Sequence, residues 1–335
     1  MNKPLIGLIV FCLTSAPPAC VSPVAAQESS RPSTPAVPVD PVEKEYEELL
    51  LEDDAAQAEV DAWIQQAPSG ETDAHPFADA TLELRIKQRF DTVRRRYESF
   101  LQRHPKHARA FVAYGSFLHD IGEELAAKAR WEQALEIDPT LPAAWNNLAN
   151  YYGHRGPVKK GFEFYEKAIE LDPAESLYYH NFGTTVYLFR KDVREYYGIT
   201  EQEVFDKALK LYDRAMELDP DNFLLASDVA QTYYGIRPMR LDDALAAWRK
   251  AHSLARDDIE RQGIEIHFAR LKIGDDRFDD AREHLSRVTH PMYEVLKERL
   301  ERNIRRQETP DTEEPPGSDP LEPKSGTPES DAVPR

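Results

Sequence analysis

Large and small apolar residues alternate at helical spacing through the middle of the chain. From Phe111 to Leu118, apolar side chains recur three or four residues apart, which places them on one face of an α-helix. The same order of residues returns at Trp145 and again at Tyr179. The pattern therefore predicts a series of similar helices.

A short phrase that ends in proline recurs together with this pattern. Pro105, Pro139 and Pro173 are 34 residues apart and close the phrases LQRHP, LEIDP and LELDP, and a fourth phrase, MELDP, closes at Pro220. A fixed period of this length is typical of stacked helix-turn-helix units. We therefore interpret the central part of the chain as a repeat array.

Alignment on these prolines brings large and small residues into common columns. The first unit has Phe111, Tyr114, Gly115, Leu118, Ala127, Trp131, Ala134 and Pro139; the second has Trp145, Leu148, Ala149, Tyr152, Gly161, Tyr165, Ala168 and Pro173; the third has Tyr179, Phe182, Gly183, Val186, Ala208, Tyr212, Ala215 and Pro220. Small residues let two antiparallel helices approach closely, and large ones fill the space between neighbouring pairs.

These columns resemble the tetratricopeptide repeat (TPR) family, whose pattern runs W, L-G, Y, A, F, A, P in the same order. The resemblance is strongest over residues 108–220, and it continues more loosely to a fifth unit with Phe268, Ala269, Ala281 and Leu285. It implies an all-α fold, a right-handed superhelical solenoid of stacked helix-turn-helix repeats over residues 78–306. The repeats are expected at about 108–141, 142–175, 176–222, 223–258 and 262–295. A helix over residues 78–103 would pack at the start and a capping helix would end near residue 306.

The third unit is longer than the period, because Pro173 and Pro220 are 47 residues apart. Gly198 is a good helix stop, and Thr200 with Glu203 forms a capping box for the next helix. We expect both helices of this unit to be lengthened into a projecting hairpin that carries Tyr196 and Tyr197. Either the hairpin is structural or these tyrosines contact a partner.

Charge is unevenly distributed near the start of the array. A helix over residues 43–65 is strongly acidic, whereas Arg89, Arg96 and Arg103 form a basic stripe on the following helix. The acidic helix also has an apolar side that must be buried. It could fold back on the stripe, or the two charged faces could each contact solvent.

Polar residues lie beside the columns on the first helix of each unit. In AAWNNLANYYG, Trp145, Leu148 and Tyr152 are expected to point into the stack, so the asparagines must face elsewhere. In the TPR family that other face lines a concave groove, and an amide offers both a donor and an acceptor to a bound peptide. The resemblance therefore implies a partner-binding groove formed by Arg109, Ser116, His119, Asn146, Asn147, Asn150, His180, Asn181, Thr184, Asp228, Gln231 and Tyr234. The alternative is that the asparagines only stabilise the helices or contact water.

The two ends of the chain differ from the array. Residues 1–26 have a basic start, an apolar run and small residues before Gln27, which is the pattern of a secretory signal cleaved after about Ala26. Both cysteines, Cys12 and Cys20, lie in this segment, and Cys20 could alternatively carry a lipid anchor. Residues 27–42 form a proline-rich linker, and residues 307–335 form an acidic tail that we expect to be disordered.

Composition and motifs narrow the range of functions. The formal net charge of −18 disfavours nucleic acid and anionic lipid as partners. The histidines show no metal-binding spacing, and there is no nucleophile elbow, phosphate loop or dinucleotide-binding turn, so no catalytic residue, cofactor, metal or small-molecule substrate is predicted.

The sequence thus favours a non-enzymatic, exported protein that binds a protein or peptide partner through its groove, as a scaffold or adaptor of an envelope complex. It would be periplasmic or secreted. The alternatives are an accessory protein of the outer membrane that is lipid-anchored at Cys20, which alone would bring a membrane contact, and an enzyme whose site is not recognised. The oligomeric state stays open.

Overall fold

The computed structural model describes residues 40–66 and 76–309. The described residues divide into two units at this end, with residues 40–45 in the first and Tyr46 at the start of the second. In the first unit, the Asp40 carboxylate accepts a hydrogen bond from the Val42 backbone N–H at 3.0 Å, at the start of helix α1 (Pro41–Gln66). The helix thus begins with a proline at a position where no backbone donor is needed.

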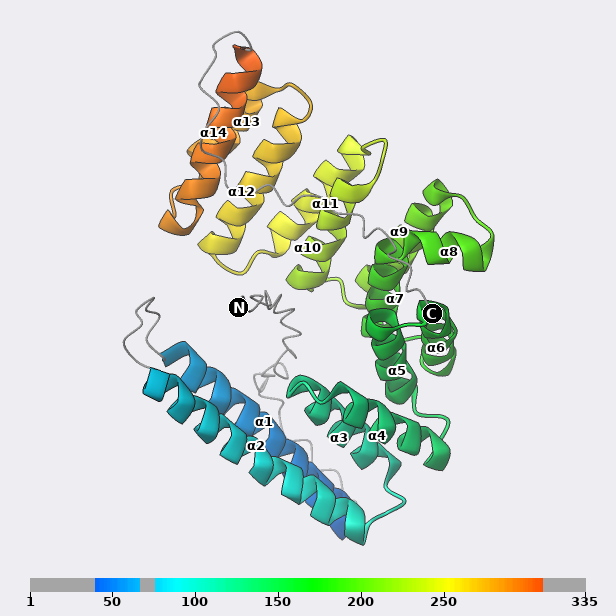
Figure 1. The fold of residues 1–335 in the computed structure, drawn as a ribbon. Coiled ribbons are helices and arrows are strands. Elements are labelled where there is room, and N and C mark those ends of the chain that lie inside the picture. Colours follow the sequence, from blue (N-terminus) through cyan, green and yellow to red (C-terminus); the bar gives the residue numbers. More distant parts are fainter. Residues whose placement is uncertain (1–39, 67–75, 310–335) are drawn as a thin grey trace, which may run out of the picture. The chain divides into compact units, whose positions relative to one another are not determined.

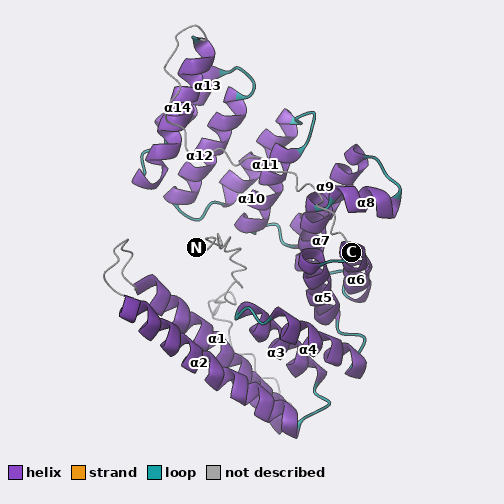
Figure 2. Cartoon of the chain, in the orientation of Figure 1, coloured by secondary structure: helices purple, strands orange, loops and turns teal. Residues whose placement is uncertain are grey.

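The regular elements of the described residues are helices (Figures 1 and 2). After α1 they are α2 (Pro76–Arg103), α3 (Ala108–Asp120), α4 (Glu124–Ile137), α5 (Pro142–Arg155), α6 (Val158–Leu171), α7 (Ser176–Leu188), α8 (Arg190–Tyr197), α9 (Glu201–Leu218), α10 (Phe223–Thr232), α11 (Leu241–Leu254), α12 (Asp258–Ile273), α13 (Phe278–Ser286) and α14 (Glu294–Glu308), with 3₁₀ turns at Tyr233–Gly235 and Pro291–Tyr293.

These helices pack as successive antiparallel pairs. The pairs are α3 with α4, α5 with α6, α7 with α9, α10 with α11 and α12 with α13, and the second helix of each pair contacts the first helix of the next. Helix α14 packs against α12 and α13 and buries Leu300 and Ile304. The predicted fold class is confirmed: the protein is an all-α solenoid of helix-turn-helix repeats. We call α3, α5, α7, α10 and α12 the first helices and their partners the second helices.

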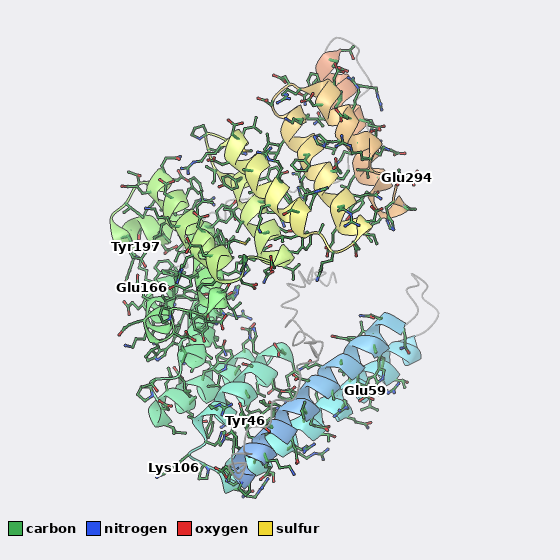
Figure 3. The ribbon with its side chains drawn as sticks, turned by 180° about the vertical axis from the view of Figure 1, so that it is seen from behind. Tyr46, Glu59, Lys106, Glu166, Tyr197 and Glu294 are labelled. Atoms are coloured by element: carbon green, nitrogen blue, oxygen red, sulfur yellow. The ribbon has the colours of Figure 1, made fainter. Side chains whose placement is uncertain are left out.

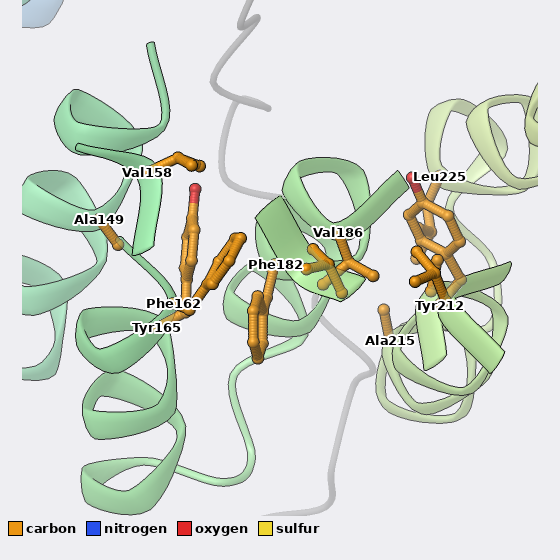
Figure 4. Packing of buried hydrophobic residues seen from close by; sticks show 12 residues of the cluster. Ala149, Val158, Phe162, Tyr165, Phe182, Val186, Tyr212, Ala215 and Leu225 are labelled. Carbon is orange, nitrogen blue, oxygen red and sulfur yellow. The ribbon is translucent and has the colours of Figure 1, made fainter. Parts of the chain in front are cut away.

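Small residues in the first helices make room for aromatic residues of the second helices. A Cβ atom on Gly115 would overlap the indole of Trp131, and one on Gly183 would lie 2.9 Å from the ring of Tyr212. Both rings are buried. Figure 4 shows the cluster that continues this packing from α5 to α10, in which Tyr165 stacks on Phe182 with ring centroids 5.2 Å apart.

The prolines that close two of the repeats accept hydrogen bonds from the next first helix. The indole of Trp145 donates to the Pro139 carbonyl at 2.9 Å, and the hydroxyl of Tyr179 donates to the Pro173 carbonyl at 3.2 Å. Trp145 was expected to point into the stack, but it is only half-buried. Its ring lies at the turn between repeats because its N–H must reach that carbonyl.

The acidic helix folds back on α2, and the two helices lie side by side (Figures 1 and 3). Arg89 pairs with Glu52 at 2.7 Å and with Glu59 at 2.8 Å, and Arg96 pairs with Glu52 at 3.1 Å. The apolar side of α1 is buried at the same time, at Leu49, Ala56 and Val60. Burial of that side supplies most of the driving force, because partly exposed ion pairs contribute only about 0–1 kcal/mol each.

The long third unit does not form the projecting hairpin that we expected. Helix α7 ends at Leu188 and a separate short helix, α8, begins at Arg190, so only the second helix, α9, is lengthened. Helix α8 contacts α6, α7 and α9. Gly198 ends α8 with a left-handed backbone conformation, and the Thr200–Glu203 capping box starts α9 as predicted.

Several predictions concern residues outside the described part of the chain. These are the signal over residues 1–26 with Cys20, the linker up to residue 39 and the tail from residue 310. The described ends differ slightly from the predicted ones, since α1 begins at Pro41 and α14 ends at Glu308. Within the described residues, every helix is too short or too polar to cross a membrane.

Candidate functional site

Polar side chains of the first helices bond from each helix to the next. We call this set the polar row, and it consists of four contacts: Asn147 Nδ2 to Ser116 Oγ at 3.2 Å, Asn181 Nδ2 to Asn146 Oδ1 at 3.2 Å, His180 Nε2 to Asp228 Oδ2 at 3.1 Å, and Tyr234 Oη to His267 Nδ1 at 3.1 Å. The contacts join α3 to α5, α5 to α7, α7 to α10, and the 3₁₀ turn after α10 to α12. They fix the register of neighbouring repeats, and they place polar groups along all five first helices.

One predicted groove residue is misassigned. Asn146 is only 2% exposed, because its amide bonds to both Asn147 and Asn181 between α5 and α7. It belongs to the interior of the polar row and offers no surface to a ligand. Asn147 and Asn181 are only half-buried, so their remaining donors and acceptors stay accessible.

Two more residues of the set receive hydrogen bonds from the second helices. The Tyr165 hydroxyl donates to Asn150 Oδ1 at 2.5 Å and lies 3.0 Å from Thr185 Oγ1, and the Tyr212 hydroxyl donates to Thr184 Oγ1 at 3.1 Å. Burial raises the pKa of both tyrosines, that of Tyr212 to about 12. These phenols therefore stay protonated, and each donates to a first-helix side chain and orients it; the Tyr165 oxygen can also accept from the Thr185 hydroxyl.

The residues of α3 lie at the N-terminal end of the row. Arg109 is exposed, and its guanidinium lies 5.0 Å from the ring centroid of Tyr46 on α1. The Tyr46 hydroxyl donates to the Arg109 carbonyl at 3.3 Å, which ties α1 to the start of the row. His119 is half-buried beside Trp131.

The other end of the row contains two residues that sequence analysis missed. His267 and Arg270 lie on α12 on either side of the Phe268-Ala269 pair, as Asn147 and Asn150 flank Leu148-Ala149 on α5. The columns therefore contain the signal for these two residues, but the fifth unit lacks the regular closing phrase that marks the repeat in the first three units.

Burial at this end of the row determines the protonation states of its side chains. Burial, with the nearby Arg270 charge, lowers the pKa of His267 to about 4, so the imidazole is neutral at pH 7. Burial raises the pKa of Tyr234 to about 12. Gln231 and Arg270 are exposed beside them. Besides the Asp228 carboxylate, the row offers mainly neutral donors and acceptors, with the Arg270 guanidinium beside this end, which suits recognition by hydrogen bonds.

The two tyrosines of the expected hairpin lie away from the row. The Tyr197 hydroxyl donates to Glu166 on α6 at 2.6 Å, and both residues are labelled in Figure 3. The Tyr196 hydroxyl lies 3.5 Å from Glu163 Oε1, and the Tyr196 ring packs edge-on against Phe162. Helix α8 thus uses both tyrosines to cover α6, which is a structural use of the insertion.

An open pocket lies outside the row, between α13 and α14. Its volume is about 390 Å³, and it is lined by Arg282, Ser286, Lys297, Glu301, Ile304 and Arg305. Arg282 is already paired with Glu308 and Asp279. Within the described residues, histidine and carboxylate side chains nowhere gather in a group of three that could hold a metal ion.

Comparison with known proteins agrees with the fold. Residues 131–156 match the tetratricopeptide repeat family, and this segment holds Trp131 of the first repeat and the whole first helix of the second. No curated protein matches this chain in sequence.

Solved structures of repeat proteins share its architecture. A monomeric mutant of IFIT1 with Gppp-AAAA is 18% identical, with a TM-score of 0.51, over 81% of this chain and 58% of IFIT1. YrrB, described as a TPR protein with an unusual peptide-binding site, is 17% identical with a TM-score of 0.46 over 62% of this chain and 97% of its own. MamA is 20% identical with a TM-score of 0.40 over 51% and 92%. Identity at this level shows the fold alone.

Proposed function

We propose that the protein binds an extended segment of a partner protein along the polar row of its first helices. The observation that carries this proposal is the continuity of the row, since every first helix contributes to it and it is not interrupted between α3 and α12. A bound segment would therefore meet regularly spaced donors and acceptors over several repeats.

The types of side chain support recognition of a peptide backbone. Asn147, Asn181 and Gln231 each carry an amide that both donates and accepts, as a peptide group does. Such groups bind an extended chain whatever its side chains are. The binding itself needs no chemical step, so the proposed role is that of a non-enzymatic scaffold or adaptor.

Peptide selection tests this role without a known partner. An unbiased library of displayed peptides is selected on the full chain, and the affinities of the selected peptides are measured for Gln231→Ala and for Lys210→Ala. Both residues are exposed: Gln231 lies on first helix α10, one turn after Asp228 of the polar row, and Lys210 lies on second helix α9. Gln231→Ala should weaken binding about threefold to tenfold, the cost of one hydrogen bond, and Lys210→Ala should have no effect. Failure to select any peptide, or equal effects of the two changes, would refute the proposal.

From the pattern of residues 1–26 we also infer export, with action in the periplasm or outside the cell. Cell fractionation and mass spectrometry of the mature N-terminus check this inference. A new N-terminus at Gln27 supports a cleaved signal, and a lipid on Cys20 supports the anchored alternative. An intact Met1 in a cytoplasmic fraction contradicts export.

A further inference from the structure

The polar row carries one carboxylate, Asp228, and this group keeps an unused acceptor. Asp228 Oδ2 lies 3.1 Å from His180 Nε2, and the Asp228 side chain is 46% exposed. In the described part of the chain, no donor reaches Oδ1, and no lysine or arginine pairs with this carboxylate. Asp228 therefore presents a formal negative charge and a free oxygen to a segment that lies along the row.

Two exposed leucines lie about one helical turn before the row on the same two helices. Leu177 is the second residue of α7 and is 45% exposed, and Leu224 is the second residue of α10 and is 47% exposed. The same position holds Arg109 in α3 and Ala143 in α5, so the leucines are specific to this part of the array. Residues four apart lie on one face of a helix, which places Leu224 beside Asp228 on α10.

The surface between α7 and α10 thus combines an apolar strip with a carboxylate one turn away. A single exposed leucine is ordinary, but these two occupy equivalent positions on neighbouring first helices that the His180–Asp228 contact holds together. One helical turn rises about 5.4 Å, a distance that the four-carbon stem of a lysine side chain spans. An anionic side chain would be repelled by Asp228, and a purely apolar one would leave its carboxylate without a partner.

We propose that Leu177, Leu224 and Asp228 form a subsite for a lysine or arginine side chain of the partner. The aliphatic stem packs on the two leucines, and the cationic head donates a hydrogen bond to Asp228 Oδ1 while Oδ2 keeps its contact with His180. The formal net charge of −18 also attracts a cationic segment to the protein. This inference rests on the proposed function, and it gives the bound segment a basic residue where it crosses α7 and α10.

The subsite is tested by NMR on the full chain, labelled at its leucine methyl groups and titrated with capped pentapeptides Ac-Ala-Ala-X-Ala-Ala-NH2. Lysine at X supplies both the stem and the charge, norleucine supplies the stem alone, and 2,4-diaminobutyrate supplies the charge on a stem shorter by two methylenes. Leu224→Ser assigns the Leu224 signals through their loss. Leu125, which is exposed on second helix α4, serves as the internal control.

The charge is tested by comparing lysine with norleucine. We expect the lysine probe to bind about threefold to fivefold more tightly, as for a partly exposed ion pair, and to move the Leu224 signals while the Leu125 signals stay in place. Asp228→Asn keeps the shape of the side chain and can still bond to His180, but it removes the charge, so it should abolish this difference. Asp242→Asn removes an equal charge from exposed second helix α11 and should preserve it.

The apolar strip is tested by comparing lysine with diaminobutyrate. Two additional methylenes on the leucines should strengthen binding about threefold, because they are only partly removed from water. This advantage should disappear in Leu224→Ser, whereas Leu125→Ser should leave it unchanged.

Three results would overturn the subsite: equal binding of the lysine and norleucine probes, no movement of the Leu224 signals at millimolar lysine probe, or an undiminished charge preference in Asp228→Asn. The unbiased peptide selection keeps this separate from the wider proposal. If selected peptides depend on Gln231 but bind Asp228→Asn unchanged, the row binds peptides without this subsite. If no peptide is selected at all, the proposed function itself is wrong.

Discussion

At the scale of single residues, the fold depends on small side chains that face buried aromatic rings. Gly115 and Gly183 lie where a Cβ atom would collide with Trp131 or Tyr212. Gly153, on the first helix between them, is different, because its Cβ would meet Thr185 at an ordinary contact distance of 3.7 Å. The three glycines are all helical and buried, so they form a matched set.

Replacement of Gly115 by alanine should therefore destabilise the protein. The collision with a packed indole costs about 1–3 kcal/mol, which exceeds the gain of up to about 1 kcal/mol in helix propensity. Gly153→Ala should be neutral or stabilising, because only the propensity changes. Urea unfolding followed by circular dichroism measures both, and equal stability of the two variants would mean that close approach at Gly115 is unimportant.

The sequence predicted these small residues and most of the polar row, because both recur in fixed columns. It could not show that Asn146 is buried, since the spacing places Asn146, Asn147 and Asn150 outside the apolar face without revealing which of them meets the next helix. It also could not reveal the hydrogen bonds between helices. Those hydrogen bonds depend on the distance between neighbouring repeats, and a column of aligned residues gives no information about that distance.

At the scale of elements, α1 is held on α2 by a half-buried carboxylate as well as by ion pairs. The Tyr97 hydroxyl donates to Asp53 at 2.7 Å. Burial raises the pKa of Asp53 to about 6, with smaller contributions from Asp120 and Asp54, against the lowering effect of the Tyr97 hydrogen bond. A carboxyl group with a raised pKa binds its proton more tightly in the folded protein than in the unfolded chain.

This shift predicts a pH dependence of the packing of α1. Since the folded state favours the protonated acid, this group's contribution to stability increases as pH falls from 7 through 6 towards 3.8, and it is lost as pH rises again. When the pH falls from 7 to 5, the contribution of Asp53 to the free energy of unfolding should increase by about 1 kcal/mol. Asp53→Asn imitates the protonated form and should lack this gain.

The free energy of unfolding of both proteins at pH 7 and pH 5 gives the comparison. Other carboxylates titrate in both proteins, so the difference between their pH responses isolates Asp53. An identical response of wild type and Asp53→Asn would show that this carboxyl titrates normally in the folded protein.

The insertion in the third unit shows what element lengths leave undetermined. The distance from Pro173 to Pro220 correctly indicated extra residues, and the capping box at Thr200 correctly gave the start of α9. The length alone could not decide between two long helices and an added short one. The chain breaks at Phe189, and α8 folds onto α6, where the rings of Tyr196 and Tyr197 pack against Phe162.

At the scale of the whole molecule, each repeat is stabilised mainly by its neighbours, so the last pair depends on the capping helix. Leu300 and Ile304 of α14 pack on a cluster that contains Ile266 and Ile273 of α12. Without α14, these apolar residues would face solvent.

A chain that ends at His290 should therefore lose hydrogen-exchange protection in α12 and α13, while α3 to α6 keep theirs. A chain that ends at Thr309 retains α14 and serves as the control. Mass spectrometry of peptic fragments reports each helix separately. Unchanged protection of α12 and α13 in the shorter chain would contradict this role of α14, and so would equal loss along the whole array.

The central claim is that the first helices form the recognition face, and cross-linking tests it most directly. A peptide selected on the full chain is resynthesised with a photoreactive group at its middle position, and the attached residues are identified by mass spectrometry. The account predicts attachment to the first helices α3, α5, α7, α10 and α12, next to residues of the polar row. Attachment mainly to the second helices, or to α8 around Tyr196, would contradict it.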